Sequence, residues 1–300
     1  MTSISDAFDH RHNHIIKKLG NLSKKLFIVK RIILAFDGPH YSDGAFEFVR
    51  RLNEYQPVFV TGIFLPHVDF NTAWTYSYSN AATWLPLIEE YSTELLNTSI
   101  SRFEQACKHY GIAFKVCSKH LDFSIPELQK ETRFADLMLL GSERFYQNLG
   151  VASPNEYLRM AIHQSECPVI VIPEKFKFPH SVVLAYDGSD DATFAIKSFA
   201  CLMPELTSLH TVLVYATNKD AAIPESNNIQ DLCSSHFPNL TLQVLGAKPT
   251  KYFGTWINDI KNPLLVCGAF GRTALSQLFK SSFITEVISD HNIPIFIAHR

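Results

Sequence analysis

Short apolar runs alternate with amphipathic stretches along most of the chain. The runs predict strands near 31–36, 57–64, 112–117, 136–140, 168–172, 181–186, 209–215, 240–245, 263–267 and 294–298. Apolar residues spaced three and four apart predict helices near 42–54, 87–109, 125–133 and 154–165 in the first half. Continuous Val, Ile and Leu runs with little alternation indicate strands that are buried on both faces, as in a parallel sheet covered by helices. The predicted fold class is α/β.

The second half of the chain repeats the first. Ile33–Gly38 (ILAFDG) matches Val183–Gly188 (VLAYDG), 150 positions later, and the helical patterns that follow have the same i, i+3, i+4, i+7 spacing of apolar residues. Pro168–Ile172 (PVIVI) likewise matches Pro294–Ala298 (PIFIA). An internal duplication therefore predicts two tandem doubly wound domains, each with a five-stranded parallel sheet.

The repeat divides the chain into four parts. They are an N-terminal extension over 1–29, a first domain over 30–173, a linker over 174–180 and a second domain over 181–300. Within the extension, Ile15 to Lys25 has the pattern of a short basic amphipathic helix that could pack on the body. The first domain also has an aromatic-rich loop, Pro66 to Glu90, which could be a lid, a partner surface or a loop packed on the sheet edge.

The strongest candidate chemistry lies after two strands of the second domain. Val182–Tyr186 ends in Asp187-Gly188-Ser189, and Leu264–Cys267 ends in Gly268, with Gly271 and then Ser281-Ser282 further on. In a parallel sheet such strand ends meet at one edge, where ligands bind. Glycine permits close approach of backbone to ligand, and a serine at a helix start offers N–H and O–H groups to a phosphate. Arg272 could neutralise phosphate charge.

These residues resemble the nucleotide-binding pattern of the universal stress protein family, Gly-x2-Gly-x9-Gly-(Ser/Thr) with an Asp at the end of the first strand. Here the pattern reads Gly268-x2-Gly271-x9-Ser281-Ser282 with Asp187, so serine replaces one glycine. The resemblance covers about residues 30–300. It implies a cytoplasmic stress-response protein in which Asp187 and Gly188 lie near adenine or ribose, while the two glycines and two serines hold the phosphates of ATP, with or without Mg²⁺. It also implies a pseudo-two-fold contact between the halves, like the usual dimer of the family, and a possible homodimer.

The first domain keeps only part of this pattern. Asp37 and Gly141 are present, but Arg144 stands in place of the second glycine, and Pro154 stands where the helix-start pair should begin. Proline has no N–H to offer a phosphate. We therefore expect the first domain to be a degenerate copy with a structural role.

Composition and motifs restrict the alternatives. A formal net charge of −2 lacks the basic footprint of a nucleic-acid-binding protein, and no apolar run reaches the length of a membrane span. Six scattered cysteines without a Cys-x-x-Cys pair favour reduced thiols, as in cytoplasmic proteins. No catalytic residue, P-loop or metal-ligand cluster is identified. The remaining alternatives are a nucleotide-free scaffold of the same fold that binds an unknown protein partner, and a slow ATPase.

Overall fold

The computed structural model describes residues 29–37, 41–65, 85–117, 125–141, 161–216, 222–246, 249–268 and 293–299. Ten strands form one sheet, and each half of the chain contributes five of them. The first half provides β1 (Lys30–Asp37), β2 (Val58–Leu65), β3 (Ala113–Cys117), β4 (Leu137–Gly141) and β5 (Val169–Ile172). The second half provides β6 (Ser181–Tyr186), β7 (His210–Ala216), β8 (Leu240–Leu245), β9 (Pro263–Gly268) and β10 (Ile295–Ala298). All ten predicted strands are confirmed to within one residue at each end.

Both halves have the same strand order. The sheet runs β3-β2-β1-β4-β5-β10-β9-β6-β7-β8, and neighbouring strands within each half are parallel. The halves meet where β5 pairs with β10 in the antiparallel direction. Ile170 pairs with Phe296, its own counterpart in the repeat, so a pseudo-two-fold axis passes between these two residues. The predicted contact between the halves is a strand pairing.

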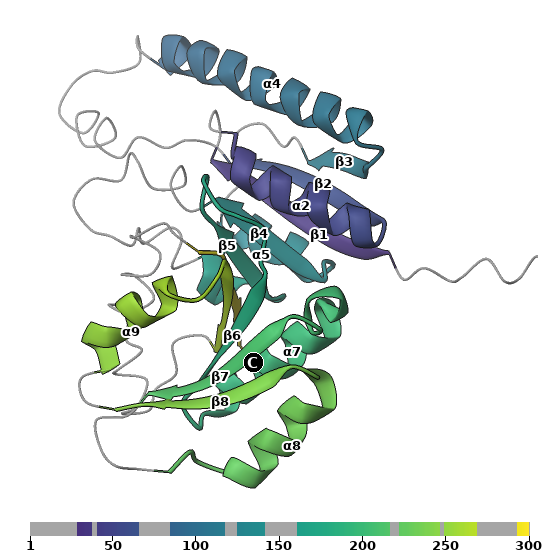
Figure 1. The fold of residues 1–300 in the computed structure, drawn as a ribbon. Coiled ribbons are helices and arrows are strands. Elements are labelled where there is room, and N and C mark those ends of the chain that lie inside the picture. The colour runs from purple at the N-terminus through teal and green to yellow at the C-terminus, as the bar shows by residue number, and fades with distance from the viewer. Residues whose placement is uncertain are drawn as a thin grey trace, which may run out of the picture.

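Helices cover both faces of this sheet (Figure 1). One face packs against α2 (Asp43–Tyr55), α4 (Leu85–His109), α7 (Asp190–Leu202) and α8 (Ser226–His236). The opposite face packs against α5 (Ile125–Thr132), the helical residues 161–164 and α9 (Pro249–Asn258). Helix α9 was not predicted, although Phe253 and Ile257 are buried at i, i+4 spacing and Pro249 begins the helix.

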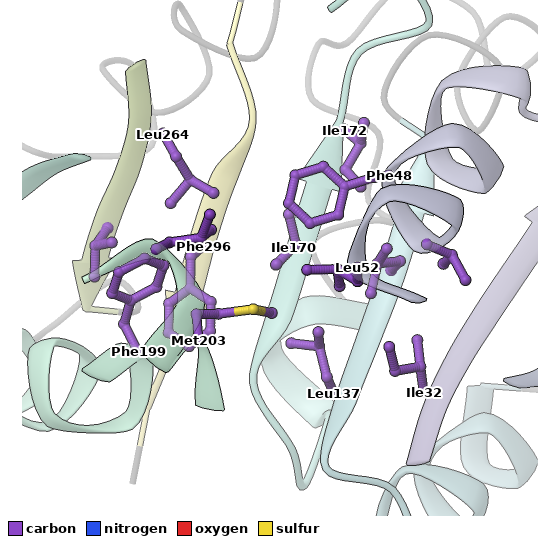
Figure 2. Close-up of a cluster of buried hydrophobic side chains, with 14 of the residues drawn as sticks. Ile32, Phe48, Leu52, Leu137, Ile170, Ile172, Phe199, Met203, Leu264 and Phe296 are labelled. Carbon is purple, nitrogen blue, oxygen red and sulfur yellow. The ribbon is translucent and has the colours of Figure 1, made fainter. Parts of the chain in front are cut away.

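Side chains from both halves form a shared core. Figure 2 shows this cluster across the junction, with Phe199, Met203, Leu264 and Phe296 from the second half facing Ile170 of the first. The side chains of Phe199, Phe296 and Ile170 have no exposed area. The halves also share a nearly buried ion pair, in which Lys30 Nζ lies 2.5 Å from Glu205 Oε1. Separating the halves would therefore expose apolar surface and leave two charges unpaired.

A serine side chain caps the first helix of each half. Ser42 caps α2 by accepting a hydrogen bond from the Ala45 N–H, at 3.2 Å. Ser189 caps α7 in the same way through the Ala192 N–H, at 3.1 Å. A side-chain cap satisfies one of the free N–H groups of the first turn and stabilises a helix by about 1 kcal/mol.

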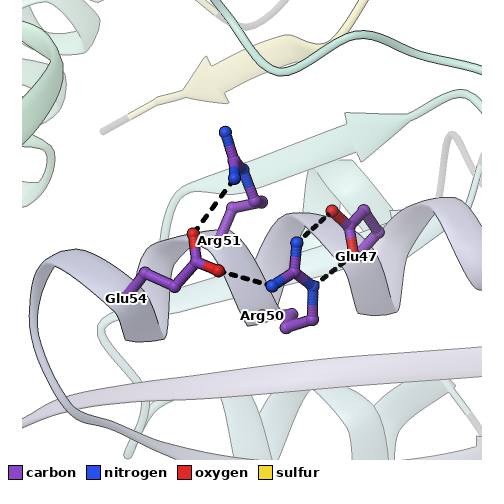
Figure 3. Close-up of polar contacts among 4 residues, drawn as sticks. All are labelled: Glu47, Arg50, Arg51 and Glu54. Atoms are coloured by element: carbon purple, nitrogen blue, oxygen red, sulfur yellow. Dashed lines mark hydrogen bonds and ion pairs between the residues drawn. The ribbon is translucent and has the colours of Figure 1, made fainter. Parts of the chain in front are cut away.

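The outer face of α2 is held by charge pairs one turn apart. Figure 3 shows Arg50 between Glu47 and Glu54, with Arg51 also paired to Glu54. Hydrogen bonding to Glu47, and then to Glu54, raises the pKa of Arg50 above its ordinary value. Pairs of this kind contribute about 0.2–0.5 kcal/mol each, so the buried face of α2 remains the main source of its stability.

The cysteines of the described ranges are free thiols that differ in burial. The free cysteines include four buried thiols, Cys107, Cys167, Cys233 and Cys267, whereas Cys201 is exposed. Cys201 occupies the solvent-facing side of α7, because the buried stripe of this helix is formed by other positions. The aromatic residues of the loop within Pro66 to Glu90 lie outside the described residues.

Candidate functional site

The strand order of the second half reverses between β6 and β9. The chain continues from β6 outward to β7, whereas β9 is followed by β10 on the opposite side. Both strands point the same way and pair through Leu184 and Val266. In open α/β sheets, ligands bind at the carboxyl ends of strands at such a reversal. The residues that follow β6 and end β9 are therefore the candidate site.

A tight turn joins β6 to α7 at this edge. Asp187 Oδ1 accepts a hydrogen bond of 2.9 Å from the Ser189 N–H, which fixes one carboxylate oxygen. The second oxygen of Asp187 accepts no hydrogen bond from any described residue. Side chains that bond to the backbone two residues on are typical of Asx turns. The turn thus holds Asp187 at the carboxyl end of β6, half-buried and with one oxygen available.

Gly188 is required by the geometry of this turn. Its φ angle of +83° is one that side-chain-bearing residues rarely adopt. A Cβ at this position would also lie 2.9 Å from the Pro224 Cβ, in the segment after β7. The positive φ and the lack of space for a Cβ are each sufficient to explain a glycine at 188, without any ligand.

Gly268 also has a packing role. A Cβ added there would lie 2.6 Å from the Ala192 nitrogen and 2.6 Å from the carbonyl carbon of Asp191. The first turn of α7 therefore packs directly on the end of β9, and only glycine leaves room for it. Helix packing is therefore a sufficient reason for a glycine at 268, and the close approach of a phosphate is not needed to explain it.

Gly141 is the counterpart of Gly268 and has an equivalent role. A Cβ there would lie 2.5 Å from the Ser42 Oγ and 2.7 Å from the Ser42 Cβ, at the start of α2. This glycine persists in the half where Arg144 and Pro154 interrupt the nucleotide pattern. That persistence was the sequence signal for a packing role.

The first half fills its own carboxyl edge with Tyr41, which the sequence analysis did not single out. Its ring stacks on Phe36 at the end of β1, with centroids 4.9 Å apart. The Arg102 guanidinium lies 4.4 Å from the centre of the same ring. The Tyr41 hydroxyl is buried and has no hydrogen-bond partner among the described residues. Burial, more than the nearby charges, raises its pKa above the ordinary range.

Glu174, at the start of the linker, also reaches this edge. Its Oε2 accepts a hydrogen bond of 3.1 Å from the Gly44 N–H in the first turn of α2. Its Oε1 is buried, and no described residue hydrogen-bonds to it. A carboxylate at a helix N-terminus is favoured by the free N–H groups and the helix dipole. The start of α2 therefore already has an anionic group from its own chain.

Two other groups at the second edge have shifted pKa values. Burial, and secondarily the Asp187 carboxylate, raise the pKa of the Cys267 thiol to about 12, so this thiol is neutral near pH 7. Burial raises the pKa of Tyr186 as well, followed by the Glu225 and Asp187 carboxylates. Neither group is prepared to act as a nucleophile or base.

The predicted site residues are only partly within the described structure. Asp187, Gly188 and Gly268 lie together at the carboxyl edge of β6 and β9, and Asp37 and Gly141 end β1 and β4. The remaining predicted residues lie outside the described residues: Arg144, Gly271, Arg272, Ser281 and Ser282. Their roles stay predictions.

Metal-binding clusters and membrane-spanning helices are both absent from the described ranges. No cluster of three or more His, Cys, Asp or Glu side chains that could hold a metal ion occurs there. None of the helices described is both long enough and apolar enough to cross a membrane.

The sequence matches no protein-family model and no curated protein. Solved structures do match. A universal stress protein from Archaeoglobus fulgidus DSM 4304 aligns with a TM-score of 0.64 and 14% identity, over 90% of this chain and 96% of that one. UspA from Lactobacillus plantarum aligns with 40% of this chain and 99% of its own at 16% identity, but with a TM-score of only 0.24. The first likeness, together with the strand order, shows that the chain has the fold of the universal stress proteins.

Proposed function

We propose that the protein is a stress-response or regulatory protein of the universal stress protein type that binds an adenine nucleotide through its second half. The ligand is ATP or another adenine nucleotide, with or without Mg²⁺. The observation that carries the proposal is the position of Asp187, which the Ser189 N–H orients at the strand reversal between β6 and β9. Its second oxygen can accept a hydrogen bond from a ribose hydroxyl or a base amino group.

The phosphate end of the proposed site depends on residues beyond the described ranges. Gly271 would allow close backbone approach, and Ser281 and Ser282 would donate N–H and O–H groups. Arg272 would supply positive charge. Serine in place of glycine at 281 is expected to weaken affinity by about tenfold, because a side chain there either strains the backbone or obstructs the phosphate.

The first half is assigned a structural role in this proposal. Arg144 and Pro154 replace parts of the phosphate-binding pattern. Independently, Tyr41 packs at the end of β1 and Glu174 binds the start of α2. We therefore expect one nucleotide per chain.

The test is calorimetric titration of the purified protein with ATP and Mg²⁺, combined with native mass spectrometry. Wild-type protein should bind one nucleotide per chain, and Gly271→Arg, which copies the first half, should abolish binding. Gly246→Arg is the matched control, since an added Cβ at Gly246 meets nothing within 4 Å. Absence of binding at millimolar ATP would disprove the proposal. Native mass spectrometry would also report whether two chains form a homodimer.

The second candidate is a nucleotide-free scaffold that acts by binding another protein. It is favoured by the packing roles of Gly268 and Gly141, which account for both glycines without a ligand. Under this function Gly271→Arg would leave partner binding unchanged, and ATP would alter neither stability nor association.

A further inference from the structure

The ten-stranded sheet has two edge strands, and they differ in charge. Among the described strands, β3 pairs only with β2, and β8 pairs only with β7 (Figure 1). At the centre of β3, Lys115 is exposed, and its Nζ lies 3.7 Å from Glu131 Oε2. A charged side chain in the middle of an edge strand opposes pairing with another chain. The β3 edge is therefore protected against such pairing.

The β8 edge does not have this protection. Its sequence, Leu240–Leu245 (LTLQVL), contains no charged residue, proline or glycine. Over 226–246, which includes α8 and β8, Asp231 is the only Asp, Glu, Lys or Arg. The apolar side chain of Val244 is 49% exposed. The side chains of β8 therefore carry no charge that would repel a second strand.

The hydrogen-bond pattern shows which backbone groups of β8 face outward. The Thr211 N–H donates to the Asn239 carbonyl at 2.9 Å, and Thr211 is paired with Leu240. In a parallel ladder, the two hydrogen bonds of a residue go to the residues on either side of its paired position. Alternate residues of β8 therefore bond to β7. The N–H and C=O groups of Leu240, Leu242 and Val244 face away from it.

These outward groups are arranged symmetrically about Leu242. In an antiparallel pair, two opposite residues whose N–H and C=O groups face each other exchange both hydrogen bonds. If Leu242 stands opposite Leu242 of a second copy, Leu240 stands opposite Val244 and Val244 opposite Leu240. All three opposed positions would then form hydrogen-bonded pairs. The outward backbone groups of β8 are therefore complementary to themselves.

The side chains of β8 fit the same pairing. Leu240 and Leu242 pack against the core on the face covered by α7 and α8, and Val244 shares this face because side chains alternate along a strand. In the symmetric pairing, these three apolar residues would form a continuous row across the junction. Thr241 and Gln243, which are uncharged, would oppose each other on the other face. Apolar cross-strand pairs without like charges stabilise a sheet.

We infer that two copies of this chain associate through antiparallel pairing of their β8 strands, centred on Leu242. The two ten-stranded sheets would continue into each other about a two-fold axis. Such a contact brings identical residues together, so an edge without charge fits a second copy of itself. The halves of one chain already meet in a similar way, since β5 pairs with β10 in the antiparallel direction. The association does not depend on the nucleotide site.

The first test is sedimentation velocity without nucleotide. One strand per copy makes a small interface, so we expect a dissociation constant on the order of 10 µM. The wild type should convert from monomer to dimer as its concentration passes through this value. Val244→Lys should weaken association by roughly tenfold or more, because it adds a charge to each strand of the pair. Phe134→Lys is the matched control and should associate like the wild type, since Phe134 is 69% exposed in the turn between α5 and β4.

Amide hydrogen exchange, followed by NMR, locates the interface residue by residue. The N–H groups of Leu240, Leu242 and Val244 should become protected only at concentrations where the dimer forms, because they then donate to the second copy. The N–H groups of Thr241 and Gln243 face β7 and should be protected at all concentrations. A dimer formed through another surface would not produce this alternation.

Val244→Pro tests the backbone hydrogen bonds directly. The Val244 N–H faces away from β7, so proline removes no hydrogen bond of the β7–β8 ladder but prevents one to a second copy. This variant should keep the circular dichroism of the wild type and remain monomeric where the wild type dimerises. If it does not fold, Val244→Lys still decides, because it retains the N–H.

Four results would overturn the inference. The first is a wild type that remains monomeric at submillimolar concentration, which would leave the β8 edge free for a strand of another protein. The second is equal association of Val244→Lys and the wild type. The third is a dimer without the alternating protection, which would place the contact elsewhere. The fourth is protection of the outward amides at every concentration, which would indicate that another segment of the same chain covers this edge.

Discussion

The two halves begin their first helix at different distances from the preceding strand, and their carboxyl edges differ accordingly. Ser42 caps α2 five residues after Asp37, whereas Ser189 caps α7 only two residues after Asp187. The three additional residues, 39–41, include Tyr41, which packs on Phe36. The second half has no counterpart of this ring. A short insertion between matching motifs is therefore enough to give one edge an aromatic residue of its own.

The packing of the two edges is otherwise similar. A glycine ends the strand beside the first helix in each half, because the start of that helix lies within van der Waals contact of the strand. The helix caps are both serines. The strand-end glycines and the serine caps are therefore features that the fold requires in both halves, whereas Tyr41 belongs to the first half alone.

The largest predicted effect concerns what the halves share. Phe296→Ala should reduce the free energy of unfolding by about 4 kcal/mol, since it removes a fully buried ring at the junction of β5 and β10. Urea unfolding followed by circular dichroism should show one transition at lower denaturant, because both halves contribute to the same core. Two separate transitions, with only the second half destabilised, would show that the halves fold independently. Ile170→Ala, at the paired position, is the matched variant.

The next effect distinguishes the two packing glycines. Gly268→Ala should reduce the free energy of unfolding by about 3 kcal/mol, because the new Cβ meets backbone atoms that cannot turn aside. Gly141→Ala should cost less, because its new Cβ meets the side chain of Ser42. Adding Ser42→Gly should recover most of the loss in Gly141→Ala and none of that in Gly268→Ala. Equal losses in both single variants, measured by urea unfolding, would refute the packing explanation.

Much of the fold was predictable from the sequence, for a clear physical reason. Strands buried on both faces consist of continuous apolar runs, and Asp-Gly, Gly-Ser and Pro boundaries mark their ends. Serine caps and the stripe Ala45, Phe48, Val49 and Leu52 likewise depend only on nearby residues, and all four side chains of that stripe are buried. Local patterns were therefore sufficient for the strands and for α2 and α7.

Features that depend on distant residues were not predictable in this way. The sequence indicated that the halves touch, but it could not indicate that β5 and β10 pair or that Lys30 meets Glu205. Glu174 reaches the Gly44 N–H across 130 positions of sequence. At the candidate site, Asp187, Gly188 and Gly268 were located correctly at one edge, but the packing role of Gly268 emerges only when α7 is placed beside β9.

A smaller effect concerns a thiol that only the second edge has. Cys267 aligns with Leu140 of the first half, and its pKa is raised from 9.0 to about 12. The folded state keeps this proton while the unfolded state loses it above pH 9, so this stability is present below pH 9 and lost as pH rises. At pH 10 the loss of stability from this thiol is about 1 kcal/mol. Between pH 8 and 10, the free energy of unfolding should fall less steeply with pH in Cys267→Ala than in the wild type. The exposed control Cys201→Ala should show the same pH dependence as the wild type.

The smallest effect has the opposite sign and belongs to the first edge alone. Tyr41→Phe should raise the free energy of unfolding by about 1 kcal/mol, because it removes a buried hydroxyl that no described residue hydrogen-bonds to and keeps the ring between Phe36 and Arg102. Tyr186→Phe is the matched variant at the end of β6. Its hydroxyl is not both buried and unpaired, so its removal should not raise the free energy of unfolding. Thermal unfolding of both variants is the measurement. A loss of stability in Tyr41→Phe would mean that an ordered water or another group satisfies this hydroxyl, and that the first edge is less completely filled than its packing indicates.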